Sequence, residues 1–195
     1  TDLMQALYGR NGESPLCVLA ATTPTNCFDM AFEAARIAIE HMTPVILLTD
    51  AFIGNGSSAW RVPEADEYPE IHPRFVPESL REGWKPYKRD EKSLVRYWAL
   101  PGTEGLMHRV GGLEKDSETG AISTDPANHE KMVALRREKV ARIADDIPRQ
   151  AGPGDKDAAT PLLASAGTHG HPRTAPADPN PPAAPRPSPQ PAART

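Results

Sequence analysis

Residues 16–50 hold two short apolar runs separated by a helical pattern, and this arrangement restricts the fold more than any other feature. The runs at 16–21 and 45–49 lack the alternation of a half-exposed strand, as is typical of strands covered on both faces of a parallel sheet. Residues 24–42 between them have the length of a right-handed crossover helix. The sequence therefore predicts an α/β fold in which the two runs are neighbouring or near-neighbouring parallel strands.

The predicted helix at 24–42 is apolar over most of its circumference. Thr23 fits the capping position, and Pro24 fits the first helical position, where its missing N–H is no loss. One narrow polar stripe consists of Asp29, Glu33, Arg36 and Glu40. Because a helix of this kind is usually buried, we expect it to pack on its own sheet and on another domain or subunit. His41 is expected to bond carbonyls at the helix end.

The last part of the chain has a different composition from the rest. Half of the 22 prolines lie in residues 150–195, where Leu162 and Leu163 are the only large apolar residues. Such a segment cannot bury enough surface to offset its ordering entropy, so residues 149–195 are predicted to be a disordered tail. Out-of-frame translation of a GC-rich gene is one hypothesis for this composition, and the genomic reading frames test it.

Charge and motifs exclude several classes of function. The net charge is −4, and the chain has no long run of one sign, so a nucleic-acid partner is not expected. The chain also lacks the run of about 18 apolar residues that a membrane span needs. The chain has no C-x-x-C pair, no G-x-G-x-x-G fingerprint and no phosphate loop, so no metal site is expected. Cys17 and Cys27 fit buried, reduced thiols and a cytoplasmic protein.

Residues 60–102 combine dense proline with most of the aromatic residues, including all three tryptophans. Proline at this density excludes long helices and central strands. Because so many aromatic side chains must pack somewhere, we expect an extended arm that wraps over a folded surface, its own or a partner's. A mobile loop is the alternative interpretation.

A second helix is predicted from Asp125, with Asp125 as its cap and Pro126 at the first position. Pro148 ends it. Its basic residues alternate with acidic ones, which is typical of a solvated helix face: Lys131, Arg136, Arg137, Lys139 and Arg142. The expected organisation is half of an α/β domain at 1–60, the arm at 61–124, a helix at 125–148 leading towards a missing domain, and the tail at 149–195.

Asp50 is the best single candidate for a functional site. It ends the second predicted strand and precedes a glycine-punctuated loop at 51–58. Ligands of open α/β sheets collect at the carboxyl ends of the strands. The alternative is that Asp50 only caps a turn.

Several ordered stretches resemble a known family, the alpha subunits of 2-oxoacid:ferredoxin oxidoreductases, and most closely those of the 2-oxoglutarate enzymes. The resemblance covers about residues 1–148. The matching stretches are 2–13, 27–36, 42–50, 55–57, 101–106, 108–114 and 128–132.

The resemblance implies a partial thiamine-diphosphate-binding domain of the pyrimidine type. In this family a beta subunit supplies the diphosphate half of the site, with Mg²⁺, and an iron–sulfur cluster. The reaction is oxidative decarboxylation of a 2-oxoacid onto coenzyme A, with electrons passed to ferredoxin. Asp50 and Asn55 are then candidates to lie near the cofactor. The catalytic residues stay unknown, because the family's substrate-binding segment is expected upstream of Thr1.

Two functions therefore stay open. One is an enzyme subunit, or part of one, in ferredoxin-linked 2-oxoacid oxidation. The other is a non-catalytic fragment that keeps only a subunit-interaction surface. A generic nucleotide-binding domain is disfavoured by the missing glycine fingerprint.

Overall fold

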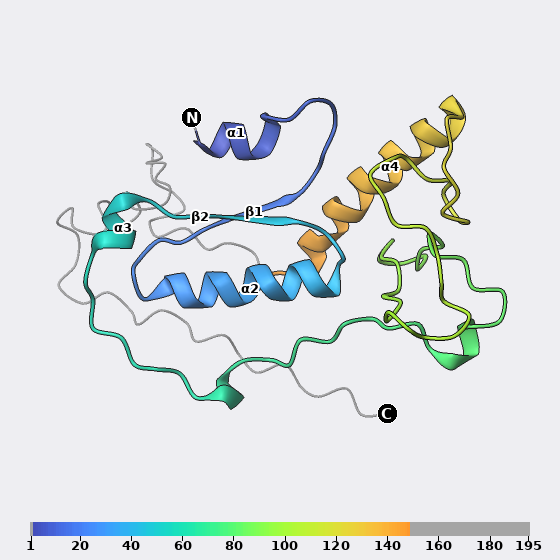
Figure 1. The fold of residues 1–195 in the computed structure, drawn as a ribbon. Helices are drawn as coiled ribbons and strands as arrows, with labels where there is room; N and C mark the ends of the chain where they lie inside the picture. The colour runs from blue at the N-terminus through green and yellow to red at the C-terminus, as the bar shows by residue number, and fades with distance from the viewer. Residues whose placement is uncertain (1, 149–195) are drawn as a thin grey trace.

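The computed structural model describes residues 2–148, and the predicted disorder of 149–195 lies outside them. Figure 1 shows a small sheet with helices on either side and a long arm that connects the sheet to the last helix. In chain order the elements are α1 (Asp2–Tyr8), β1 (Cys17–Ala20), α2 (Asn26–Glu40), β2 (Val45–Leu48), α3 (Ala51–Asn55) and α4 (Pro126–Arg142). Short 3-10 turns occur at Ala65–Glu67, Glu78–Leu80 and Ile143–Asp145.

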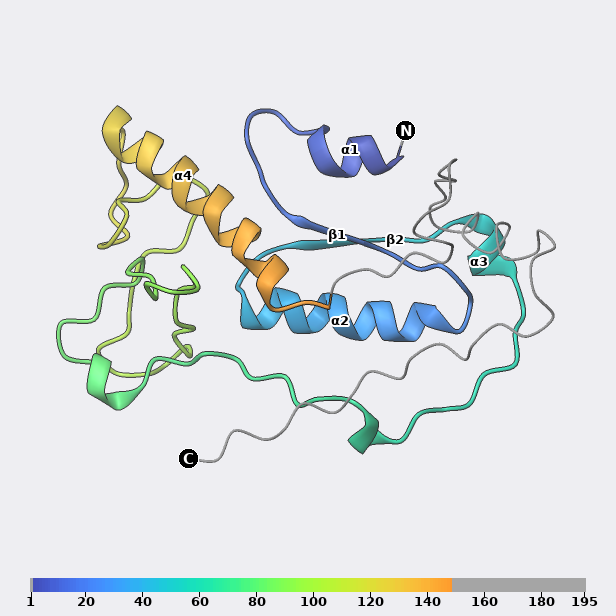
Figure 2. The ribbon, with the colours of Figure 1, turned by 180° about the vertical axis from the view of Figure 1, so that it is seen from behind.

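The two strands pair in parallel, as predicted. Their register runs from Cys17 opposite Val45 to Ala20 opposite Leu48. The helix α2 lies along one side of this pair and α1 along the other, in both views of the ribbon (Figures 1 and 2). The predicted burial on both faces is only partly found, since every residue of both strands is half-buried. The described sheet has two strands, and the short α1 covers little of it.

The helix α2 begins at Asn26, two residues after the predicted first position. The Thr23 hydroxyl nevertheless accepts the Asn26 N–H at 3.1 Å, so Thr23 satisfies a backbone donor of the first turn as a cap does. The predicted all-round burial of this helix is not found within residues 2–148. Ile37 is fully buried, whereas the Phe28 side chain on the outer side is 45% exposed.

The aromatic arm wraps the protein's own surface, along the outer side of α2 (Figure 1). The Tyr68 hydroxyl donates to Asp29, and the Tyr68 ring contacts Phe28 and Phe32 with centroids 5.5 and 4.7 Å away. Trp60 adds a second ring contact to Phe28. The apolar helix surface that predicted a partner is therefore partly covered by the arm.

Further along, the arm bonds the second half of α2. The Trp98 indole donates to the Ile39 carbonyl at 2.8 Å, and the His72 backbone N–H donates to the Glu40 carboxylate at 3.0 Å. Glu40 also pairs with Arg36, at 2.9 Å. The helix α2 thus bonds the arm through its polar stripe and the Ile39 carbonyl, and its aromatic side chains provide the apolar contacts.

The end of α2 contradicts one sequence-based expectation. The His41 ring does not bond the helix carbonyls. It is buried, and its Nε2 lies 3.4 Å from the Asp146 carboxylate, just beyond α4. Burial lowers the pKa of His41, and the Asp146 carboxylate opposes this shift. The contact joins the carboxyl ends of the two long helices.

The helix α4 begins as predicted, with Pro126 in its first turn and the Asp125 carboxylate accepting the Ala127 N–H at 3.0 Å. The expected solvated basic face is wrong for three of its residues. Lys139 donates to the Met42 carbonyl at 2.7 Å, Arg142 donates to two carbonyls of the arm, and Arg136 pairs with Glu13. These side chains hold α4 against the remainder of the protein.

Candidate functional site

The carboxyl ends of β1 and β2 lie at one edge of the sheet, where the sequence placed the candidate site. The predicted loop at 51–58 is not irregular throughout, because residues 51–55 form α3. The Asp50 carboxylate accepts the Ile53 N–H at 2.8 Å and so caps this short helix. Ile53, 2% exposed, anchors it to the core. Asp50 therefore has the capping role that was the alternative interpretation.

Asn55 lies at the other end of α3 and is exposed. Its side-chain amide donates to the Ala51 carbonyl at 2.8 Å, within the same helix. The next residue, Gly56, has no room for a side chain. A Cβ there would lie 2.8 Å from the Phe52 carbonyl oxygen and 3.4 Å from Pro24. The connection after β2 therefore packs closely against the start of α2.

The end of β1 is also held by short polar side chains. The Asn26 side-chain oxygen accepts the Thr22 N–H at 3.2 Å, and the Thr23 hydroxyl contacts the Thr25 hydroxyl at 3.1 Å. Ala21, fully buried, donates its N–H to the Leu48 carbonyl. The polar side chains at this edge therefore fix the path of the backbone. The polar groups named here bond one another and form no arrangement of nucleophile and base.

Metal-ligating side chains do not gather anywhere in the described part of the chain. Within residues 2–148, no three side chains of the His, Cys, Asp or Glu type lie close enough together to hold a metal ion. Asp50 and Asn55 stay candidates for proximity to the cofactor. No helix of the same residues is long and apolar enough to cross a membrane.

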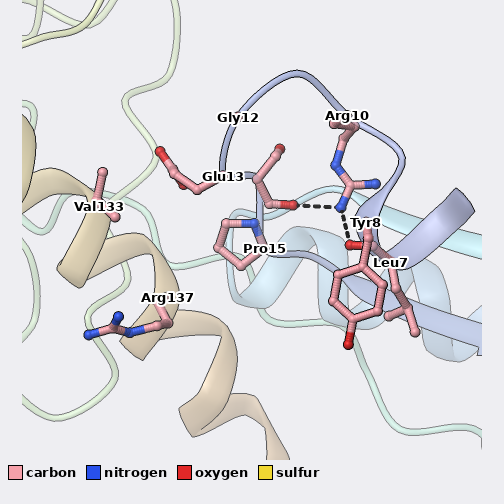
Figure 3. Close-up of a pocket in the computed structure, with 9 residues that line it drawn as sticks. Leu7, Tyr8, Arg10, Gly12, Glu13, Pro15, Val133 and Arg137 are labelled. Atoms are coloured by element: carbon pink, nitrogen blue, oxygen red, sulfur yellow. Dashed lines mark hydrogen bonds between the residues drawn. The ribbon is translucent and has the colours of Figure 1, made fainter. Parts of the chain in front are cut away.

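A shallow hollow of about 300 Å³ lies between the α1–β1 connection and α4 (Figure 3). Arg10 at its rim points back towards the protein. Its guanidinium donates to the carbonyls of Ala6, Leu7 and Ser14, and it thereby satisfies the carboxyl end of α1. Arg137 and Val133 line the hollow from α4.

Sequence reasoning missed a group of cations formed by Arg89, Arg96 and Lys139. Arg89 and Arg96 face each other across an antiparallel bridge in the arm, whereas Lys139 comes from α4. The spacing of these residues along the chain gives no signal of their proximity. The density of basic residues between 85 and 96 is the one hint that the sequence offers.

The comparisons with known proteins decide the family. The family described as pyruvate flavodoxin/ferredoxin oxidoreductase, thiamine diphosphate-binding, matches residues 1–126. The chain belongs to this family. The resemblance to the 2-oxoacid:ferredoxin oxidoreductases is thus confirmed at the level of the family and its thiamine-diphosphate-binding domain.

Among individual relatives, the chain is 52% identical over 142 residues to the 2-oxoglutarate oxidoreductase subunit KorA of Mycobacterium tuberculosis. That match covers 73% of the chain and 21% of the relative. The 2-oxoglutarate synthase subunit KorA of Methanothermobacter marburgensis is 27% identical over 147 residues, covering 75% of the chain and 38% of the relative. The chain therefore spans about a fifth to two fifths of these two relatives.

The fold is similar to that of a solved structure. It is the 2-oxoglutarate:ferredoxin oxidoreductase from Magnetococcus marinus with 2-oxoglutarate, coenzyme A and succinyl-CoA bound. The TM-score is 0.66 at 28% identity, covering 76% of the chain and 25% of that structure's chain. The partial parallel-sheet fold of this family member agrees with the sequence-based fold class.

Proposed function

We propose that this family member serves in the alpha subunit of a 2-oxoglutarate:ferredoxin oxidoreductase. The reaction is oxidative decarboxylation of 2-oxoglutarate to succinyl-CoA with reduction of ferredoxin, in the cytoplasm. The single observation that carries the proposal is the 52% identity over 142 residues to the mycobacterial 2-oxoglutarate oxidoreductase subunit. The reaction balances, because cleavage of the bond to the carboxylate releases CO2 and leaves an electron pair on the former carbonyl carbon. Ferredoxin takes up these two electrons one at a time, and the coenzyme A thiol loses its proton as it forms the thioester.

The proposed division of work follows from what the described residues contain. The family binds thiamine diphosphate. As the family resemblance implies, the proposal assigns Mg²⁺ with the diphosphate, and the iron–sulfur cluster, to a beta subunit. This chain's own contribution is the edge formed by the carboxyl ends of β1 and β2. There, Asp50 and Gly56 set the path of the backbone.

A chimera tests this proposal directly. Residues 2–126 replace the matching segment of the mycobacterial subunit, which is produced with its own beta subunit. The expected result is reduction of a viologen dye that depends on 2-oxoglutarate and coenzyme A, above a boiled control. A correctly assembled chimera without such activity would overturn the proposal.

Gly54 in α3 and Gly56 directly after α3 give a matched pair of variants in the chimera. Gly56→Ala places a Cβ 2.8 Å from a backbone oxygen, whereas Gly54→Ala places one in open space. We expect Gly56→Ala to lower activity and Gly54→Ala to preserve it. Equal activity in both variants would show that the reaction does not depend on the backbone path at the carboxyl edge of the sheet.

The second candidate is a non-catalytic module that keeps a subunit-interaction surface. The exposed apolar side chains of the segment 100–113 favour it, since Met107 is 95% exposed and Val110 is 84% exposed. An assembled but inactive chimera supports this candidate. Co-purification of the 195-residue chain with the beta subunit, without activity, supports it further.

A further inference from the structure

Three cationic side chains gather between the arm and α4. Arg89 and Arg96 lie opposite each other in an antiparallel bridge. The Arg96 guanidinium sits 4.2 Å from the centre of the Tyr87 ring, a cation–π contact. Lys139 reaches the same region from α4, with its ammonium donating to the Met42 carbonyl at 2.7 Å. We call Arg89, Arg96 and Lys139 the cation cluster.

The three side chains of the cation cluster are partly buried and affect one another. Burial, followed by the charges of Arg89 and Arg96, lowers the pKa of Lys139 to about 8. Burial, followed by the charges of Arg96 and Arg136, lowers the pKa of Arg89 to about 10. The charges of Arg89 and Arg96 therefore destabilise the charged form of Lys139, and the charge of Arg96 destabilises that of Arg89. Partly desolvated like charges at this proximity are unfavourable unless an anion joins them.

No carboxylate of the described residues forms an ion pair with the cation cluster. The nearby Asp90 is directed elsewhere, accepting from the Ser93 N–H and hydroxyl at 2.7 Å each. Glu13 and Glu114 pair with Arg136 instead. Arg89 also has an unmet donor, because its Nε is buried without a hydrogen-bond partner, while its Nη1 donates to the Leu94 carbonyl at 2.9 Å.

We propose that Arg89, Arg96 and Lys139 bind a phosphate group of a small anionic ligand. A carboxylate brings one negative charge to three cations, whereas a phosphate group brings up to two and has more acceptor oxygens. Two guanidiniums and an ammonium provide the fork-like and point-like donors that phosphate recognition uses. The orphaned Arg89 Nε–H supplies one donor that the protein itself leaves unused. Arg89, Arg96 and Lys139 are each half-buried residues, so none of the three is fully enclosed by the protein.

The test uses the 195-residue chain with inorganic pyrophosphate as the probe, followed by titration calorimetry and thermal unfolding. Sodium chloride at the same ionic strength is the reference, and citrate tests a polycarboxylate of comparable charge. We expect pyrophosphate to bind and to raise the melting temperature above both references. Absence of binding, or an equal rise with citrate, overturns the proposal.

Variants locate the site. Arg96→Gln and Lys139→Gln should each weaken pyrophosphate binding at least about tenfold. Each variant loses one charged hydrogen-bond donor, which contributes about 1.5 kcal/mol or more. The control Lys88→Gln removes the same charge from an exposed neighbour of Arg89 and should change binding less than about twofold. Lys139→Arg should retain binding. Equal weakening by Lys88→Gln indicates non-specific attraction and overturns the assignment.

Discussion

Asn128 joins the hairpin at 114–123 to α4, and its replacement by alanine tests how strongly this junction supports the fold. The Asn128 side-chain oxygen accepts the Ser117 N–H at 3.0 Å. Its amide nitrogen donates to the Lys115 carbonyl, also at 3.0 Å. All three residues are buried, with exposed fractions of 9%, 8% and 2% for Asn128, Ser117 and Lys115.

The expected magnitude follows from the two backbone groups that Asn128→Ala would strand. A buried polar group left without its partner costs about 1–3 kcal/mol. Because water can partly satisfy the two groups, we expect the free energy of unfolding to fall by about 2–4 kcal/mol. For a protein of this size each kcal/mol corresponds to about 2–4 °C, so the melting temperature should fall by about 5–15 °C.

The assay is denaturant and thermal unfolding followed by circular dichroism, on the 195-residue chain and two variants. The neighbour His129 is the control, because its ring pairs with Glu114 but its side chain is 62% exposed. His129→Ala should change the free energy of unfolding by no more than about 0.5 kcal/mol. If Asn128→Ala is no more destabilising than His129→Ala, the junction does not carry the stability assigned to it.

Three further predictions concern protonation, the arm and activity. Burial holds the pKa of His41 below its value in the unfolded chain, 6.5, so stability should fall as pH drops below about 6.5. In His41→Gln this part of the pH dependence should vanish in denaturant titrations between pH 7.5 and 5. The hydrogen bond to Asp29 raises the pKa of Tyr68 to about 12, and Asp29→Asn should return it towards 10 in NMR titrations of labelled tyrosine. A normal Tyr68 pKa in the unsubstituted chain would show that the arm is not bonded there. The 195-residue chain with thiamine diphosphate, magnesium, coenzyme A and 2-oxoglutarate should show no sustained viologen reduction, because half a site cannot orient the reacting groups. Sustained reduction above a boiled control would contradict this.

Sequence patterns correctly predicted the helices and strands that depend on residues close together in the chain. The apolar runs at 16–21 and 45–49 identified parallel strands, since a crossover of that length has few alternatives. Asp125 and Pro126 located the start of α4, because capping depends on neighbouring residues alone. The same holds for Thr23, whose hydroxyl bond survives although the helix is assigned from Asn26.

Features that depend on contacts distant in sequence could not be predicted. His41 and Asp146 lie at the ends of two helices, and only the tertiary fold brings them together. Lys139 has the spacing of a solvated helix residue, yet its ammonium bonds the Met42 carbonyl. Periodicity reports which side of a helix is polar, but it does not report which segment will cover that side.

The arm explains how so small a sheet is held. Two parallel strands with half-buried residues provide little core, and a lone strand pair is marginal in water. In this protein the arm adds a layer on the far side of α2 through Tyr68 and Trp98, which bond residues 10 positions apart on that helix, Asp29 and Ile39. Because α2 is then fixed from both sides, the sheet edge that carries Asp50 and Gly56 is positioned by contacts made far from it. Substitutions of Tyr68 or Trp98 in the arm should therefore affect the candidate site through α2.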